Sequence, residues 1–372
     1  MKITNLEVIH VLPRWSFLKV STDEGIDGWG EAIVEGRSRT VEMAIKELEP
    51  HLLGQDPRKI QHLWQSMYRG TFYHGGPVLT SAISGIDQAL WDILGKYLNA
   101  PVSQLLGGAV RDRIRMYGHV GGNTLDEIHA SAKRAVENGF TAVKTSIGYP
   151  ARFLESPAWI HREIERFEAI RDAIGPDNDF AVDFHGRIQP ALAIKICKEL
   201  ERLNPLFVEE PCLSEDLDEM ARIARATSIP IATGERLFTK YAFRDLLAKK
   251  AAVIVQPDLA HCGGISEGLN IARMAEAHFA AFAPHNPLGP INLAASLNVS
   301  AVVANFLAQE HVHLGEGYIK QPFVVENGYI KVPTGPGLGI EVDEEAIREK
   351  TYDGSWDTPR WFHEDDGSVA DW

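Results

Sequence analysis

Three carboxylates stand at the ends of short apolar segments, and equal distances separate them along the chain. Asp183 ends DFAVD, Glu209 ends PLFVE and Glu235 ends IPIATGE, with a spacing of 26 residues from each to the next. A strand, a helix and two short loops occupy about that length, so we expect equivalent positions on three successive strand–helix units. Converging carboxylates repel one another unless a cation lies between them, and oxygen-only ligands suit Mg²⁺ or Mn²⁺. The spacing therefore predicts one Mg²⁺ per chain, with Mn²⁺ as the alternative, although a lone carboxylate at a strand end is more often an ion-pair partner.

Further polar side chains end the later apolar segments. Asp258 ends AVIVQPD, His285 ends FAAFAPH and Glu310 follows NFLAQ, at spacings of 23, 27 and 25 residues along the same series. His185 lies two residues beyond Asp183, and side chains two apart on a strand share a face. A single histidine is as often structural as functional. Two histidines around a metal triad, however, indicate an acid/base pair.

The elements that must position these side chains form a repeating pattern. Eight short apolar segments occur between residues 115 and 311, and amphipathic stretches such as LDEIHASAKRAVENG lie between them. Continuous apolar strands that alternate with helices predict a parallel sheet, and eight such units predict an α/β fold of the (β/α)8-type barrel class over residues 117–318. The alternative is an open doubly wound sheet, which we disfavour because no Gly-rich phosphate loop follows any strand.

The two ends of the chain differ from this repeat. Residues 1–116 change from strand-like alternation to helical periodicity near residue 39, which predicts an α+β capping domain. Residues 319–372 contain a β segment interrupted by Gly and Pro and then an aromatic-rich end. This C-terminal segment is too short to fold alone, so we expect it to pack on the capping domain and complete it.

Composition restricts the class of partner. The net charge of −14 over 372 residues argues against nucleic acid, since phosphate contacts need clustered Lys and Arg. A small anionic substrate stays compatible, because a bound cation dominates its local field. Cys197, Cys212 and Cys262 lack metal-binding spacing, and such a sparse, odd number is typical of a reducing compartment. We find no signal peptide and no apolar run near about 18 residues, so we expect a cytoplasmic protein without a membrane partner.

Several segments resemble the enolase superfamily, in its mandelate racemase-like branch. They are VDFHGR, VEEP, TGER, QPDLAHCGG, APHNPLGP and LAQEH, together with RWSFLKVSTDEGIDGWGEA near the N-terminus. The closing WFHEDDGSVADW is similar to the ends of sugar-acid dehydratases in this branch. The resemblance covers nearly the whole chain and implies Mg²⁺-assisted removal of the proton beside a carboxylate, followed by loss of water.

The resemblance also implies roles for single residues. His285 would be the base at C2, with Asp258 fixing its tautomer, and His185 would be the acid that protonates the departing 3-hydroxyl. These two roles are interchangeable on the sequence alone. Lys144, on the segment TAVKTS, and Glu310 would bind the substrate carboxylate, with Glu310 either protonated or in a strong hydrogen bond.

One departure from the branch separates possible reactions. Many members carry a K-x-K motif whose second lysine is a base, but this chain has Lys144-Thr145-Ser146. Dehydration by two histidines is therefore favoured over racemisation by a lysine and a histidine. D-Galactonate is the favoured sugar acid, with D-gluconate, D-mannonate or a pentonate as alternatives. An epimerase acting on an α-hydroxy acid and a non-enzymatic barrel are the other classes, and a homo-oligomer is expected.

Specificity is expected to come from loops that close over the barrel mouth and exclude water. The candidates are Arg14 and Trp15, the segment Tyr73-His74-Gly75-Gly76, and Trp361 from the C-terminal segment. Packing between the C-terminal segment and the cap is an equally good explanation for Trp15 and Trp361. Glu210, directly after Glu209, should face away from the mouth by strand alternation.

Overall fold

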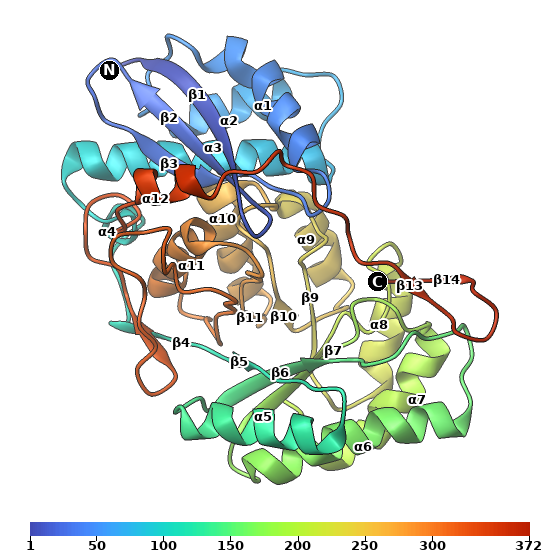
Figure 1. The fold of residues 1–372 in the computed structure, drawn as a ribbon. Helices are drawn as coiled ribbons and strands as arrows, with labels where there is room; N and C mark the ends of the chain where they lie inside the picture. The colour runs from blue at the N-terminus through green and yellow to red at the C-terminus, as the bar shows by residue number, and fades with distance from the viewer.

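The computed structural model describes all of residues 1–372, and its N-terminal part is an antiparallel sheet packed against helices. Strands β1 (Ile3–Val11), β2 (Trp15–Thr22) and β3 (Gly28–Glu31) pair in that order, as the alternation predicted. Helices α1 (Ser38–Leu52), α2 (Ile60–Arg69), α3 (Pro77–Leu98) and α4 (Val102–Leu105) follow. Figure 1 shows this part as a separate blue and cyan unit at the top of the molecule.

Close packing of β3 on α3 explains the glycines in GWGEA. A Cβ on Gly30 would lie 1.9 Å from the carbonyl oxygen of Gly85, which is in the middle of α3. Any larger residue at position 30 would therefore push the strand off the helix. Many apolar side chains of this N-terminal part form their own buried cluster, whereas others, such as Trp15 and Phe17, belong to the main core.

A parallel sheet forms the second layer. Its strands are β5 (Gly118–His119), β6 (Ala142–Ser146), β7 (Asp179–Asp183), β8 (Phe207–Glu209), β9 (Ile231–Thr233), β10 (Ile254–Val255) and β11 (Ala281–Phe282). The helices that follow them are α5 (Leu125–Glu137), α6 (Pro157–Ile174), α7 (Pro190–Leu200) with the 3-10 turn η1 (Glu201–Leu203), α8 (Leu217–Ala226), α9 (Thr239–Ala248), α10 (Gly264–Ala277) and α11 (Pro290–Val302). The spatial order of the seven strands equals their order in the chain, unlike a doubly wound sheet, whose order reverses. The fold is thus mixed α/β, with a parallel sheet and a separate N-terminal domain.

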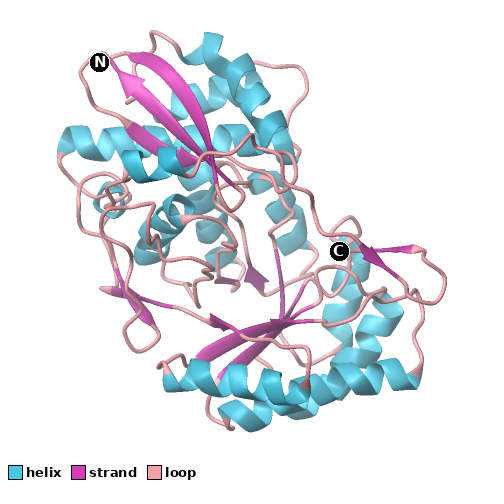
Figure 2. Cartoon of the chain, viewed as in Figure 1, coloured by secondary structure: helices cyan, strands magenta, loops and turns pink.

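The last strands are shorter than the sequence predicted. β10 and β11 have two residues each, and Pro257 and Pro284 follow them closely. Proline has no N–H to donate to the neighbouring strand, so the backbone pairing ends there. The eighth apolar segment is not a strand of the sheet; two isolated parallel bridges, Phe282 with Phe306 and Met116 with Gln309, connect it to its neighbours. Figure 2 shows how short the magenta strands are there beside the pink loops.

Two buried carboxylates fasten the N-terminal domain to the helices of the parallel sheet. Glu31 at the end of β3 accepts the N–H groups of Gly289 at 2.7 Å and Asn292 at 3.0 Å, at the start of α11. Asp87 on α3 accepts the N–H of Ser266 at 2.9 Å, at the start of α10. Helix N-termini carry free N–H groups and partial positive charge, so they stabilise such carboxylates.

The C-terminal segment contacts three different parts of the molecule. α12 (Glu344–Glu349) packs on the capping domain, where Glu344 pairs with Lys19 at 2.7 Å. β12 (Tyr329–Lys331) instead pairs with β4 (Arg113–Arg115). β13 (Trp361–Phe362) and β14 (Val369–Ala370) form a hairpin beyond both, at the end of the red segment in Figure 1. The sequence led us to expect that the whole segment packs on the cap. Only part of it does.

The three cysteines are free thiols and all are buried. None of the helices is long and apolar enough to cross a membrane.

Candidate active site

The ends of three neighbouring strands bring the predicted carboxylates together. Asp183 and Glu209 are the last residues of β7 and β8 and are direct partners in the parallel ladder. Glu235 follows the next strand, β9, after Gly234. One ligand oxygen from each of the three lies within 4.8 Å of the others. The equal spacing in the sequence thus corresponds to one cluster at the carboxyl edge of the sheet.

Burial and mutual repulsion dominate the electrostatics of this cluster. Burial raises the pKa of Glu209 well above its ordinary value, and the charge of Asp183 adds to the shift. Burial and the nearby Glu210 raise the pKa of Glu235 to about 8. Asp183 differs, because His185 and Lys144 outweigh its burial and hold its pKa below the ordinary value. The site therefore has an excess of negative charge that a cation would neutralise.

The cluster fits a divalent metal of the Mg²⁺ type. Asp183 Oδ2 and Glu235 Oε2 are buried and accept no hydrogen bond. Protein donors hold the other oxygens: Asp183 Oδ1 accepts the N–H of His185 at 2.8 Å, and Glu209 Oε2 accepts from Gln256 at 2.7 Å. Orphaned, oriented carboxylate oxygens with no sulfur nearby are the donor set that Mg²⁺ prefers.

Lys144 and Glu310 lie directly beside the triad. Lys144 Nζ is 2.7 Å from Glu209, 3.1 Å from Glu310 and 3.2 Å from Asp183. Glu310 also accepts the N–H of Asn286 at 2.9 Å. Lys144 and His285 outweigh the burial of Glu310 and hold its pKa well below the ordinary value. Of the two states expected for Glu310, the geometry favours the ionised one in strong hydrogen bonds.

His285 is oriented by a buried carboxylate. Its Nδ1 lies 2.8 Å from Asp258 Oδ2, while Nε2 lies 3.2 Å from Glu235 Oε2. Asp258 is itself fixed by the N–H of Ala260 at 2.7 Å and the amide of Asn292 at 3.0 Å. Burial lowers the pKa of His285, but Glu235 and the other carboxylates outweigh this and raise it well above its ordinary value.

His185 reaches the site from a turn and not from the strand. β7 ends at Asp183, and His185 has the left-handed φ of +50°. The argument from strand alternation was therefore wrong, although the side chain does face the site: Nε2 is 3.1 Å from Asp183 Oδ2. Its Nδ1 has no hydrogen-bond partner, and burial lowers its pKa to about 4. The two histidines have pKa values moved in opposite directions, which is typical of acid/base pairs.

A cavity of about 900 Å³ opens over this cluster. Its wall includes the predicted residues Arg14, His185, Glu235 and His285. It also includes residues that the sequence analysis did not select: Glu35, Arg187, Arg236, His261 and Trp372. Arg236 directly follows Glu235 in TGER, and Arg187 lies two residues after His185 in VDFHGR, so their proximity in sequence was the available signal.

Two of the cap candidates have different surroundings. Arg14 lines the cavity, pairs with Glu35 at 3.2 Å and donates to the carbonyl of Pro287 at 3.1 Å. Trp15 is 2% exposed and packs in the core, with its ring 4.8 Å from that of Tyr318. Trp15 does not line the cavity, so its position favours the packing explanation.

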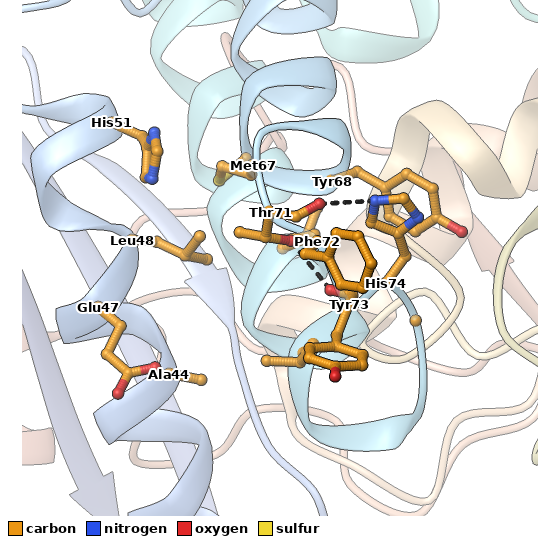
Figure 3. A pocket seen from close by; sticks show the side chains of 13 residues that line it. Ala44, Glu47, Leu48, His51, Met67, Tyr68, Thr71, Phe72, Tyr73 and His74 are labelled. Atoms are coloured by element: carbon orange, nitrogen blue, oxygen red, sulfur yellow. Dashed lines mark hydrogen bonds between the residues drawn. The ribbon is translucent and has the colours of Figure 1, made fainter.

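The segment Tyr73–Gly76 does not reach the mouth. His74 Nε2 donates to the carbonyl of Thr71 at 2.8 Å, and its ring stacks on Tyr68, with ring centroids 5.1 Å apart. It lines a separate cavity of about 260 Å³ inside the capping domain, which Figure 3 shows from close by. Only Pro77, just after this segment, lines the larger cavity.

Fold and site together define a class: an enzyme whose carboxylate cluster at the carboxyl ends of parallel strands could hold a divalent metal, beside an N-terminal domain. The family model for the mandelate racemase/muconate lactonizing enzyme N-terminal domain matches residues 12–107, and that for the enolase C-terminal domain-like family matches residues 127–346. The chain belongs to the enolase superfamily, in its mandelate racemase/muconate lactonizing enzyme branch.

Individual relatives match over the full length. The chain is 48% identical to a D-galactonate dehydratase of Verminephrobacter eiseniae and 47% identical to one of Ralstonia nicotianae, with all of each chain covered. A solved mandelate racemase/muconate lactonizing enzyme from Sulfitobacter sp. superimposes with a TM-score of 0.91 at 34% identity, covering 96% of this chain and 97% of that one.

Proposed function

We propose that the chain is a Mg²⁺-dependent hydro-lyase that converts D-galactonate into a 2-keto-3-deoxy sugar acid. The observation that carries the proposal is the placement of two histidines beside a buried carboxylate triad, with His285 held by Asp258 at 2.8 Å and His185 3.1 Å from Asp183. The names of full-length relatives support the substrate. Other aldonates, such as D-gluconate, D-mannonate or a pentonate, remain the alternatives for the substrate.

The residues of this chain would divide the work as follows. Asp183, Glu209 and Glu235 would hold the metal, which supplies positive charge where the substrate carboxylate gains electron density. Mn²⁺ has the same ligand preference and is the second choice. Lys144 and Glu310 would orient that carboxylate, because Lys144 contacts the triad and Glu310 contacts Lys144.

His285 would remove the C2 proton, and His185 would deliver a proton to the departing 3-hydroxyl. Asp258 holds Nδ1 of His285, so that Nε2 is the nitrogen available to substrate. In the chain alone, the pKa directions would make His185 the neutral histidine and His285 the protonated one. The reverse assignment of base and acid is therefore the alternative, and isotope exchange separates the two.

The architecture that we infer is a closed (β/α)8-type barrel. The bridges from Phe282 to Phe306 and from Met116 to Gln309 support closure, since they connect both edges of the sheet through the eighth segment. We assign residues 1–116 to the cap, 117–318 to the barrel and 319–372 to the C-terminal segment. Assembly into a homo-oligomer stays a prediction.

The test is a panel of C5 and C6 aldonates incubated with the Mg²⁺-loaded protein. We expect a 2-keto-3-deoxy product from D-galactonate, detected as its semicarbazone, and no product after removal of the metal by a chelator. Absence of turnover across the whole panel would overturn the proposal. Exchange of the C2 proton for deuterium without loss of water would indicate an epimerase instead.

A further inference from the structure

Arg187 is a buried guanidinium at the mouth of the site. It follows β7 by four residues, is 6% exposed and lines the 900 Å³ cavity. Its Nε has no hydrogen-bond partner, and its only hydrogen bond runs from Nη1 to the carbonyl of Ile147 at a long 3.4 Å. A guanidinium offers five N–H donors, so most of its capacity is unused.

The other two arginines of the cavity wall are fully engaged. Arg14 pairs with Glu35 and donates to Pro287. Arg236 pairs with Glu210 through both Nε and Nη2 and also donates to the carbonyl of His185 at 2.9 Å. Arg187 has no carboxylate partner, and its single contact with a carbonyl is the long one to Ile147. Burying polar groups without partners is costly, so Arg187 is the arginine in this wall whose free donors a ligand would satisfy.

The surroundings of Arg187 do not satisfy its donors. Burial lowers the pKa of Arg187, and the negative charges of Asp183, Glu235 and Glu163 oppose that shift only in part, from a distance. None of these carboxylates is within ion-pair range of its nitrogens. The guanidinium therefore lacks an acceptor oxygen within hydrogen-bond distance. A neutral hydroxyl supplies such an oxygen.

The C-terminal hairpin holds Arg187 in place. The Trp361 ring of β13 lies over the guanidinium at 4.0 Å, and stacking of this kind fixes the plane of an arginine. The hairpin is in turn tied to the barrel side, where Arg152 pairs with Asp366 at 3.0 Å. Trp372, the last residue, lines the same cavity. A segment far from the metal triad in sequence thus builds one wall of the site.

We propose that Arg187, stacked on Trp361, binds the C4 hydroxyl of the sugar acid and discriminates its configuration. The inference rests on the proposed function and extends it. Asp183, His185 and Arg187 follow one another at the end of β7 and in the turn after it. Asp183 would hold the metal near C1, and His185 would contact the 3-hydroxyl. Arg187 would then contact the next hydroxyl along the substrate, at C4. D-Galactonate and D-gluconate differ only in configuration at C4, so this contact separates them.

The experiment compares kcat/KM of the Arg187→Gln and Trp361→Leu variants for D-galactonate, 4-deoxy-D-galactonate and D-gluconate. Arg187→Gln should lower kcat/KM for D-galactonate by about 10- to 100-fold, since a hydrogen bond from a charged donor is lost. The same variant should lose less than about 3-fold with 4-deoxy-D-galactonate, which has no hydroxyl to bind. Discrimination between D-galactonate and D-gluconate should shrink in parallel. Trp361→Leu should show a smaller loss with the same dependence on the 4-hydroxyl.

Controls separate this inference from general damage and from the proposed function. Arg187→Lys keeps the charge without the planar fork and should also lose discrimination. Arg222→Gln alters an exposed arginine of α8 and should change nothing. Mg²⁺ affinity and Tm should match wild type in every variant.

An equal loss of kcat/KM for D-galactonate and its 4-deoxy analogue in Arg187→Gln would overturn the assignment. A larger loss with galactarate, the diacid, would also overturn it, because Arg187 would then bind a distal carboxylate. Failure of wild type to turn over any aldonate would instead refute the proposed function itself.

Discussion

At the scale of single residues, an excess of negative over positive charges determines the electrostatics of the site. Lys144 is the one ammonium in contact with the triad, and it is shared among three carboxylates. Coulomb interactions are strong at such distances when water is excluded. Burial and, after it, repulsion from neighbouring carboxylates raise the pKa values of two triad carboxyls. Protons and a divalent cation therefore compete for the same oxygens.

This competition predicts that Mg²⁺ binding depends on pH. The pKa of Glu235 is raised to about 8, so below that pH the metal must displace a proton. Apparent affinity should rise by up to about tenfold per pH unit between pH 6 and 8 and then level off. Calorimetry in buffers of different ionisation enthalpy should detect about one proton released per metal at pH 6.5. An affinity that is constant from pH 6 to 9 would contradict this account.

At the scale of elements, the strands position the triad and the turns after them position the acid/base groups. The sequence predicted the first of these well, since strand ends follow from apolar runs and a regular spacing. It could not predict that His185 sits in a left-handed turn, because a single φ of +50° depends on local hydrogen bonds. Nor could it show that Arg187 lacks a partner, since pairing is decided by contacts distant in sequence.

Helix N-termini connect the N-terminal domain to the parallel-sheet layer, and this contact is open to a stability test. Glu31→Ala should lower the free energy of unfolding by about 3 kcal/mol, because two buried N–H groups at the start of α11 lose their acceptor. Glu137→Ala, an exposed change at the end of α5, should stay within about 0.5 kcal/mol. Denaturant unfolding measures both. Equal values for the two variants would show that Glu31 does not fasten the domains.

At the scale of the whole molecule, three regions far apart in sequence build one cavity. The N-terminal domain supplies Arg14 and Glu35, the parallel-sheet layer supplies His185 and His285, and the C-terminal segment supplies Trp372. The sequence predicted the cap's share only in part: Arg14 reaches the mouth, whereas His74 lies in another cavity. Which loop of a cap faces a mouth depends on how two domains dock, and that information is not local. The metal triad, by contrast, needs only one regular repeat.

The central claim is that His285 removes the C2 proton and His185 delivers a proton to the departing 3-hydroxyl. Incubating D-galactonate in D₂O with the Mg²⁺-loaded variants, and following the C2 proton by NMR, tests it most directly. His185→Asn should still exchange that proton while dehydration falls by about 10²- to 10⁴-fold, and His285→Asn should lose both. The opposite pattern would exchange the two roles. Dehydration at the wild-type rate by both variants would contradict the account.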